Sequence, residues 1–320
     1  MGRPADPSRQ EGEHVSTADP APDAKPSGFG RGSGDDGKSD PFEAPEIAGE
    51  TTRLPLWRRK PLLIAGFVIL TAFVLLAVFG PLFVSDPRVT DTANTYEAPS
   101  PDHWFGTDKF GRDVFARAVH AARLDITIGI VIAMAAMVVG STIGVVSGYF
   151  GGWVDEGLMR ITDVVLAFPG FVLALILVAA IGNTIPNVII AVTIAYIPYF
   201  IRLTRAQVLS ERELEYVDGA KLAGNGRWRI AFRHVLPNSM GPSVVQAALV
   251  AGWAILTVAG LAFLGVGIRP PTAEWGVMVA EGAPDIMTGQ WWTALFAGGM
   301  IVLAAMAFQF IGDDLGAEGV

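Results

Sequence analysis

Hydrophobic positions gather in five long uncharged runs that fill more than half of the chain after residue 60. They are Pro61–Ser85, Ile126–Val154, Val164–Ile201, Val235–Ile268 and Ile286–Gly312. A hydrocarbon core about 30 Å thick is crossed by about 20 apolar residues in a helix. Each run is therefore long enough to span a bilayer, and the pattern predicts an all-α membrane protein.

The third run is too long for a single crossing and is interrupted by residues that favour a turn. Its 38 residues contain Gly182–Asn187, which combines Gly, Asn and Pro. We therefore expect a helical hairpin here, and Pro169 and Pro198 are expected to kink its two helices. This makes six transmembrane helices, with cores near 62–84, 126–147, 159–181, 187–205, 242–264 and 292–311.

The distribution of basic residues predicts the orientation. Cytoplasmic loops of membrane proteins carry an excess of Lys and Arg. Outside the N-terminal tail, 12 basic residues fall on the side of the first span's N-terminus and six on the opposite side. The run Arg58–Lys60 directly precedes the first span. We predict that both chain ends are cytoplasmic, which also places the segment 206–240 in the cytoplasm.

Acidic residues are concentrated at the N-terminus. Residues 1–52 carry five Lys or Arg and eleven Asp or Glu, a net charge of −6, in a chain of net charge −8 that is 51% hydrophobic and 17% charged. A segment so rich in Pro, Gly, Ser and acidic residues cannot bury enough apolar surface to fold. We expect a disordered acidic cytoplasmic tail over 1–53 and a six-span domain over 54–320. The negative charge excludes a broadly basic nucleic-acid binder.

The tail contains a phosphate-loop match that we interpret as coincidental. Gly32 is followed, after four residues, by Gly37-Lys38-Ser39. A working phosphate loop lies between a buried strand and a helix, and neither pattern flanks this one. Asp35 and Asp36 would also place negative charge against a bound phosphate. We expect no nucleotide or other cofactor to bind this chain.

Other chemistry-bearing residues are sparse. The chain has no Cys, which excludes disulfides, thiolate metal sites and cysteine nucleophiles. His103 and His120 are isolated, so no metal site is expected. Intramembrane enzymes and ion-coupled transporters use ionisable residues within their spans. The five apolar runs contain none, and Arg202 and Arg205 intrude at the inner end of the fourth span. The pattern favours a pore that draws its energy from another protein.

A glycine stripe in the second run predicts close helix packing. Gly140, Gly144, Gly148 and Gly152 recur every four residues, so they share one helix face, where the absence of side chains lets another helix approach. We expect this contact to lie within the chain, and a contact with another subunit is the alternative.

Two short helices are predicted in the loop 211–237. Carboxylates favour the positive N-terminal end of a helix, and three open the first helix: Glu211, Glu213 and Glu215. Gly224–Gly226 ends that helix, because Gly and Asn accept the left-handed conformation of a cap. A basic amphipathic helix follows from Arg227 to His234. Small residues at 219, 220 and 223 leave the first helix a smooth surface suited to docking.

This loop resembles the signature of ABC importer permeases. The sequence Asp218-Gly219-Ala220, three residues, Gly224, nine residues and His234-Val235-Leu236-Pro237 matches the spacing of Glu-Ala-Ala, three residues, Gly, nine residues and Ile-x-Leu-Pro. Asp218, Gly219 and His234 are substitutions within that pattern. In the family this loop is a coupling helix that enters a groove on the ATP-hydrolysing subunit. The resemblance implies eight coupling residues: Glu215, Asp218, Gly219, Ala220, Gly224, His234, Leu236 and Pro237.

Two further stretches, Gly106–Asp113 and Leu261–Gly276, resemble the second permease of dipeptide, oligopeptide and nickel importers. The charges at 108, 112 and 113 alternate in sign and predict a local ion-pair network. A structural clamp, a docking surface for the binding protein and an outer gate are all open interpretations. The residues implied by this motif are Gly106, Thr107, Asp108, Gly111, Arg112, Asp113, Pro270, Pro271, Trp275 and Gly276.

The resemblance implies the permease subunit of an ATP-driven importer in a bacterial cytoplasmic membrane. Its implied partners are a related permease in a heterodimer, two ATP-binding subunits that hold ATP and Mg, and an extracytoplasmic substrate-binding protein. Short peptides are the expected substrate. Nickel or a nickel chelate is the alternative within the same family, and an ion-coupled secondary transporter is a more distant one.

Overall fold

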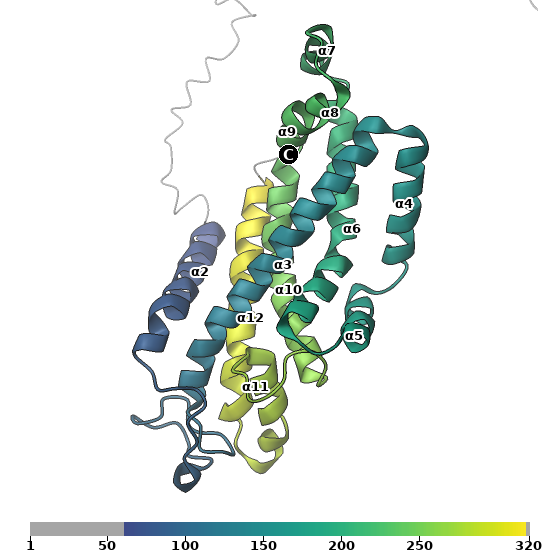
Figure 1. The fold of residues 1–320 in the computed structure, drawn as a ribbon. Helices are drawn as coiled ribbons and strands as arrows, with labels where there is room; N and C mark the ends of the chain where they lie inside the picture. Colours follow the sequence, from purple (N-terminus) through teal and green to yellow (C-terminus); the bar gives the residue numbers. More distant parts are fainter. Residues whose placement is uncertain (1–60, 318–320) are drawn as a thin grey trace, which may run out of the picture. The chain divides into compact units, whose positions relative to one another are not determined.

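The computed structural model describes residues 61–317, and the regular structure in that range is helical. Five helices there are long and apolar enough to cross a membrane. They are α2 (Pro61–Phe79), α3 (Val114–Phe150), α6 (Ile185–Glu211), α10 (Gly241–Phe263) and α12 (Trp292–Ala317) (Figure 1). The tail, with its phosphate-loop match, lies outside the described residues.

The expected third span is two helices and not one. α4 (Gly152–Leu166) and α5 (Gly170–Ile181) are bent by 87° relative to each other. The helix stops before Pro169, because proline lacks the N–H that the helix would need and restricts the residue before it. Counted together as one broken span, α4 and α5 bring the total to six. α6, in contrast, continues through Pro198 as a single helix.

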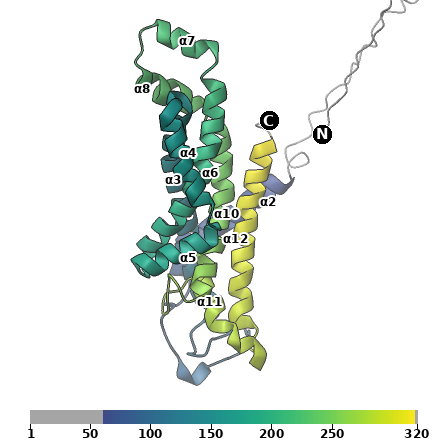
Figure 2. The same cartoon turned by 90° about the vertical axis from the view of Figure 1, so that its right-hand side faces the viewer.

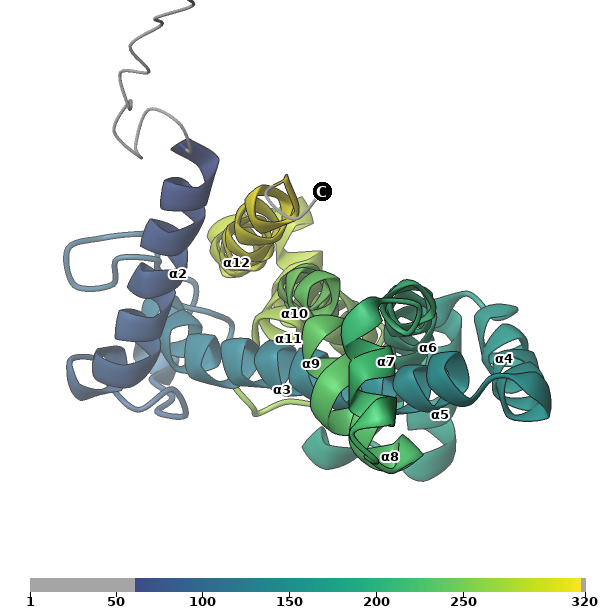
Figure 3. The ribbon, with the colours of Figure 1, turned by 90° about the horizontal axis from the view of Figure 1, so that it is seen from above.

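α3 is the central helix of the domain and begins well before the predicted core at residue 126. Asp113 caps it, because its carboxylate accepts a hydrogen bond from the Ala116 N–H at 2.8 Å. Viewed from above, α3 has α2 beside one end and α4 beside the other, while α6 and α10 pack along its length (Figure 3). α12 packs against α2 and α10.

The glycine stripe is the contact between α3 and α6, as predicted for packing within the chain. A Cβ placed on Gly140, Gly144 or Gly148 would lie 2.5 to 2.8 Å from an atom of α6, a separation at which atoms overlap. Gly152 is not part of this contact. It begins α4 with a φ of +58°, and a Cβ there would meet nothing within 4 Å.

Leucine in place of Gly144 should prevent the α3–α6 contact. Its side chain would overlap the Ile201 carbonyl, 2.8 Å from the position of the added Cβ, and overpacking of this kind costs about 1–3 kcal/mol or more. We expect a large loss of monodisperse protein in detergent size-exclusion chromatography. Gly157→Leu is the matched control, because a Cβ at Gly157 meets nothing within 4 Å. Equal yields of the two variants would contradict the assigned packing.

The short helices lie at the two ends of the domain (Figure 1, Figure 2). One end carries α7 (Glu215–Leu222), α8 (Arg227–Ile230), a π-helical turn (Ala231–Val235) and α9 (Leu236–Asn238). The other end carries α11 (Trp275–Gly282), a 3-10 segment (Pro284–Thr288) and the loop 83–113. The two groups of predicted site residues are therefore separated by the length of the long helices.

Candidate functional site

Gly224 ends α7 in the left-handed conformation that its sequence context predicts. Its φ is +77°, and its N–H donates to the Lys221 carbonyl at 3.0 Å. The next N–H, of Asn225, reaches back to the Ala220 carbonyl at 3.2 Å, and the Asn225 side-chain amide donates to the same oxygen at 3.1 Å. These backbone bonds form a Schellman cap. The cap sets the direction in which the chain leaves α7.

The loop 211–237 has a small hydrophobic core of its own. Val217 and Ala220 of α7 pack with Ile230 and Val235 and with the ends of α3 and α6. Ala220 is only 9% exposed, so it does not lie on a docking face as the sequence suggested. A helix turns by about 100° per residue, so the residues beside it point outward. Gly219 is exposed and Leu222 is 90% exposed.

The boundaries of the two loop helices also differ from those expected. α6 continues to Glu211 and α7 begins at Glu215, so only Glu215 and Asp218 lie in the first turn of α7. Glu211 instead accepts a hydrogen bond from the Tyr216 hydroxyl at 2.7 Å. The basic helix extends past His234 into α9, because Pro237 sits in the first turn of α9, where proline is tolerated.

Four other predicted coupling residues have different surroundings. His234 and Leu236 are half-buried, and Leu236 packs against the loop core. Asp218 is exposed and forms an ion pair with Lys221 at 2.8 Å. Pro237 is exposed. The structure thus brings the eight residues into one compact element, whose surface carries Asp218, Gly219 and also Leu222, which the family pattern does not include.

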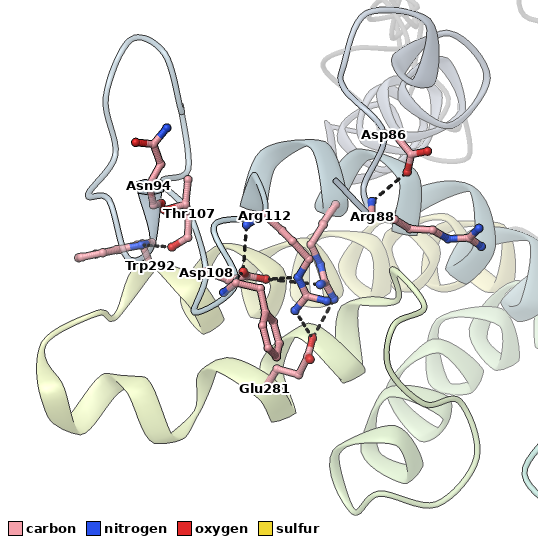
Figure 4. A network of polar contacts seen from close by, with 10 residues as sticks. Asp86, Arg88, Asn94, Thr107, Asp108, Arg112, Glu281 and Trp292 are labelled. Carbon is pink, nitrogen blue, oxygen red and sulfur yellow. Dashed lines mark hydrogen bonds and ion pairs between the residues drawn. The ribbon is translucent and has the colours of Figure 1, made fainter. Parts of the chain in front are cut away.

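The opposite end contains a buried ion-pair network (Figure 4). Arg112 Nε lies 2.6 Å from Asp108 Oδ2, and Arg112 Nη2 lies 3.0 Å from Glu281 Oε2. Arg117 contacts the same two carboxylates, at 3.4 Å and 2.9 Å. The side chains of Arg112 and Arg117 are only 5% and 1% exposed. Two guanidinium groups and two carboxylates therefore neutralise one another where little water reaches them. Their ion pairs join the loop before α3 to α11.

Asp113 does not belong to this network, which corrects the expected alternation. One oxygen caps α3, and the other lies 2.8 Å from His103 Nδ1. The sequence did not identify Glu281 as a member of this network, because nothing in the sequence near α11 distinguishes it from a surface glutamate. Only the distance between α11 and Arg117 in the folded chain identifies it.

The remaining residues of the outer motif shape the loop 83–113. Gly106 and Gly111 have φ values of +71° and +70°, and a Cβ on Gly111 would overlap the Asp91 carbonyl. Thr107 is fully buried; its hydroxyl donates to the Asn94 carbonyl at 2.5 Å, and its own carbonyl accepts from Trp292 Nε1 at 3.1 Å (Figure 4). These contacts attach the loop to the start of α12.

Trp275 and Gly276 anchor α11 within the domain. The Trp275 side chain is fully buried and its indole N–H donates to the Ala118 carbonyl at 3.0 Å. A Cβ on Gly276 would lie 2.4 Å from the Cα of Ala259, so α10 and α11 approach closely there. The preceding Pro270-Pro271 peptide bond is cis, and both prolines are exposed.

Two buried carboxyl groups were not anticipated from the uncharged runs. Asp125, one residue before the second run, accepts a hydrogen bond from the Trp275 N–H at 2.9 Å. Glu274 is 1% exposed and caps α11 by accepting from the Val277 N–H at 2.6 Å. Burial raises the pKa of Glu274 above its ordinary value. Among residues 61–317 there is no group of three or more metal-ligating side chains.

Two family models match the sequence. The model described as a binding-protein-dependent transport system inner membrane component matches residues 140–314, which include α7, α8 and α9. The model described as the N-terminal TM domain of oligopeptide transport permease C matches residues 57–99, which include α2. Together they match residues 57–314 except for 100–139.

Curated proteins and a solved structure give consistent similarities. The chain is 43% identical, over 81% of its length and 85% of the relative, to the dipeptide transport system permease protein DppC of Alkalihalophilus pseudofirmus. It is 36% identical, over 81% of its length and 85% of the relative, to the oligopeptide transport system permease protein OppC of Bacillus subtilis. Its fold resembles a chain of the MetNI methionine ABC transporter, with a TM-score of 0.51 and 15% identity over 63% of this chain and 95% of that one.

Proposed function

This chain belongs to the family of binding-protein-dependent transport system inner membrane components, and we propose that it forms half of the translocation pathway of an ATP-driven importer of short peptides. It is a multi-pass protein of the inner membrane. The observation that carries the function is the 43% identity to a dipeptide permease over 81% of the chain. The long apolar helices account for the membrane location.

The importer needs partners that this chain does not supply. Family membership supports a second permease subunit, two ATP-binding subunits and an extracytoplasmic substrate-binding protein. ATP and Mg would be held by the ATP-binding subunits, because the sequence on either side of the phosphate-loop match in the tail has neither the strand pattern nor the helix pattern that such a site needs. The chain itself is a membrane component, and we propose that the ATP-binding subunits catalyse ATP hydrolysis.

The loop 211–237 is the element suited to receive motion from the ATP-binding subunits. It projects from one end of the long helices (Figure 1), and its core joins it to the ends of α3 and α6. A displacement of α7 would therefore be transmitted to two spanning helices. On the exposed face, Leu222 offers an apolar side chain at 90% exposure, and Gly219 leaves open space beside it. We assign the partner contact to this face, on the cytoplasmic side.

The ion-pair network at the other end supports a structural clamp as the role of the outer motif. Arg112, Arg117 and Asp108 are buried and already satisfied by one another and by Glu281. A docking surface needs accessible groups, which this network does not offer. This ion-pair network holds the loop 83–113 against α11 and so stabilises the conformation of the outer end of the pathway.

Short peptides are favoured over nickel as the substrate. Relatives over most of the chain are named as dipeptide, D,D-dipeptide and oligopeptide permeases. No cluster of metal-ligating side chains occurs in the described part of the chain.

A transport assay tests the proposed function. Membrane vesicles containing this chain with its partner subunits and binding protein should accumulate radiolabelled dialanine when ATP is supplied, and the ATP-binding subunits should co-purify with the chain. Nickel chelates supplied to the same vesicles should not be accumulated. If the vesicles accumulate nickel chelates and do not accumulate dialanine, the substrate is a nickel chelate and not a peptide. Dialanine uptake that depends on an ion gradient and not on ATP would contradict the importer assignment.

A further inference from the structure

An aromatic cavity lies between α5, α6 and α10. Its volume is about 170 Å³. Four of its lining residues have aromatic side chains and a fifth has a hydroxyl: Phe171, Tyr196, Tyr199, Trp253 and Thr257. No charged residue lines it. Tyr196, Tyr199 and Trp253 stand near the middle of α6 and α10, so the cavity lies deep in the apolar region and not at its edge.

Two of the cavity's polar groups are satisfied by each other. The Thr257 hydroxyl donates to the Trp253 carbonyl at 2.9 Å. It has thereby used its one proton, so the Tyr196 hydroxyl, 2.9 Å from Thr257 Oγ1, is the donor between the two side chains. This pair joins α6 to α10 and forms the wall of the cavity.

Two further donors have no partner within the described part of the chain. Tyr199 is 40% exposed and Trp253 is 45% exposed, and neither the Tyr199 hydroxyl nor the Trp253 indole N–H makes a hydrogen bond to residues 61–317. An unsatisfied polar group in hydrocarbon costs several kcal/mol. Lipid chains cannot accept these hydrogen bonds. The occupant of the cavity must offer acceptor atoms and needs no fixed charge.

We propose that the aromatic cavity contacts the backbone of the transported peptide, with Tyr199 and Trp253 donating hydrogen bonds to its carbonyl groups. This inference rests on the proposed function. Every residue of a peptide has a carbonyl oxygen, whatever its side chain, so backbone contacts give affinity without selecting among peptides. Aromatic faces add contacts to both apolar and cationic side chains. The pathway therefore has an aromatic, hydroxyl-bearing site on α6 and α10.

A second permease subunit is the competing occupant of this surface. Its helices could cover Tyr199 and Trp253 and supply acceptors from their own side chains. The two occupants differ in one accessible property, because a peptide pathway admits water and a subunit interface does not.

Cysteine labelling distinguishes these occupants, since the chain has no cysteine of its own. Tyr199→Cys and Trp253→Cys should each react with the charged, membrane-impermeant thiol reagent MTSET in vesicles that contain the assembled transporter. Turnover with dialanine and ATP should slow the reaction. Ile190→Cys is the matched control, because Ile190 is 51% exposed and lies on the opposite side of α6. It should react with a lipophilic maleimide and not with MTSET.

Two outcomes of the labelling would overturn the proposal. If the cysteines at 199 and 253 resist MTSET but cross-link to the second permease subunit, the cavity is a subunit interface. If they react only with the lipophilic maleimide, as the control does, the cavity faces lipid. Reaction with MTSET that dialanine and ATP leave unchanged would indicate a water-filled recess outside the pathway, and this too contradicts the proposal.

Tyr199→Phe tests the hydrogen bond itself while keeping the ring. Dialanine transported per ATP hydrolysed should fall about threefold to tenfold, because one hydrogen bond to the passing peptide is lost. Assembly and ATP hydrolysis should remain at the parental level, whereas a purely structural defect would lower them as well. If Tyr199→Phe transports as much dialanine per ATP hydrolysed as the parent does, the proposed hydrogen bond from Tyr199 to the peptide is refuted. Absence of dialanine uptake in the parent would instead refute the proposed function, which separates the two failures.

Discussion

Valine in place of Gly224 should reduce ATP-driven dialanine uptake by more than tenfold. Gly224 has a φ of +77°, and a β-branched residue in the left-handed region costs about 1–3 kcal/mol. The cap would rearrange, and α7 would no longer leave the loop core in the direction that partner contact needs. The spans are not altered, so the variant should still insert. Uptake and co-purification of the ATP-binding subunits are the two measurements.

Gly224→Asn is the matched control, because asparagine accepts the left-handed conformation more easily than other residues with side chains. It should retain most of the uptake, and space does not prevent it, since a Cβ there meets nothing within 4 Å. Leu222→Arg tests the contact face independently and should also block assembly, because it places a charge where an apolar side chain is exposed. If Gly224→Val and Leu222→Arg both assemble and transport normally, the loop 211–237 is not the coupling element.

Glutamine in place of Glu281 should lower the stability of the domain by about 3–5 kcal/mol, the usual effect of removing one partner of a buried ion pair. The change leaves Arg112 and Arg117 with Asp108 as the remaining carboxylate of the network. The two positively charged guanidinium groups then repel each other at a site where water does not screen their charges. For a domain of this size the midpoint of thermal unfolding should fall by on the order of 10 °C. Tryptophan fluorescence in detergent measures it.

Asp163→Asn is the control for Glu281→Gln. Asp163 pairs with Arg202 at 2.6 Å, but both side chains are 56% exposed, and exposed ion pairs contribute only about 0–1 kcal/mol. Its unfolding midpoint should stay within a few degrees of the parent. Equal and small shifts in the two variants would mean that the clamp does not stabilise the outer loop.

Several features of the protein follow from the sequence because they depend on neighbours along the chain. Apolar runs such as Pro61–Ser85 predict spanning helices from length alone. The cap at Gly224 is a property of a few consecutive residues, and its left-handed φ agrees with that prediction. The stripe that includes Gly144 predicts close packing because its four-residue spacing matches the helix period. The signature in the loop 211–237 indicates the family because it consists only of residue types at fixed spacings along the chain.

Other features depended on the tertiary structure, because they join residues far apart in the sequence. Glu281 enters the ion-pair network only because α11 packs beside the start of α3. Whether Ala220 or Leu222 points outward depends on which face of α7 the loop core covers. Tyr199 and Trp253 share a cavity only where α6 and α10 meet. Local pattern determines which helices form, and the packing of one helix on another decides which side chains remain free to act.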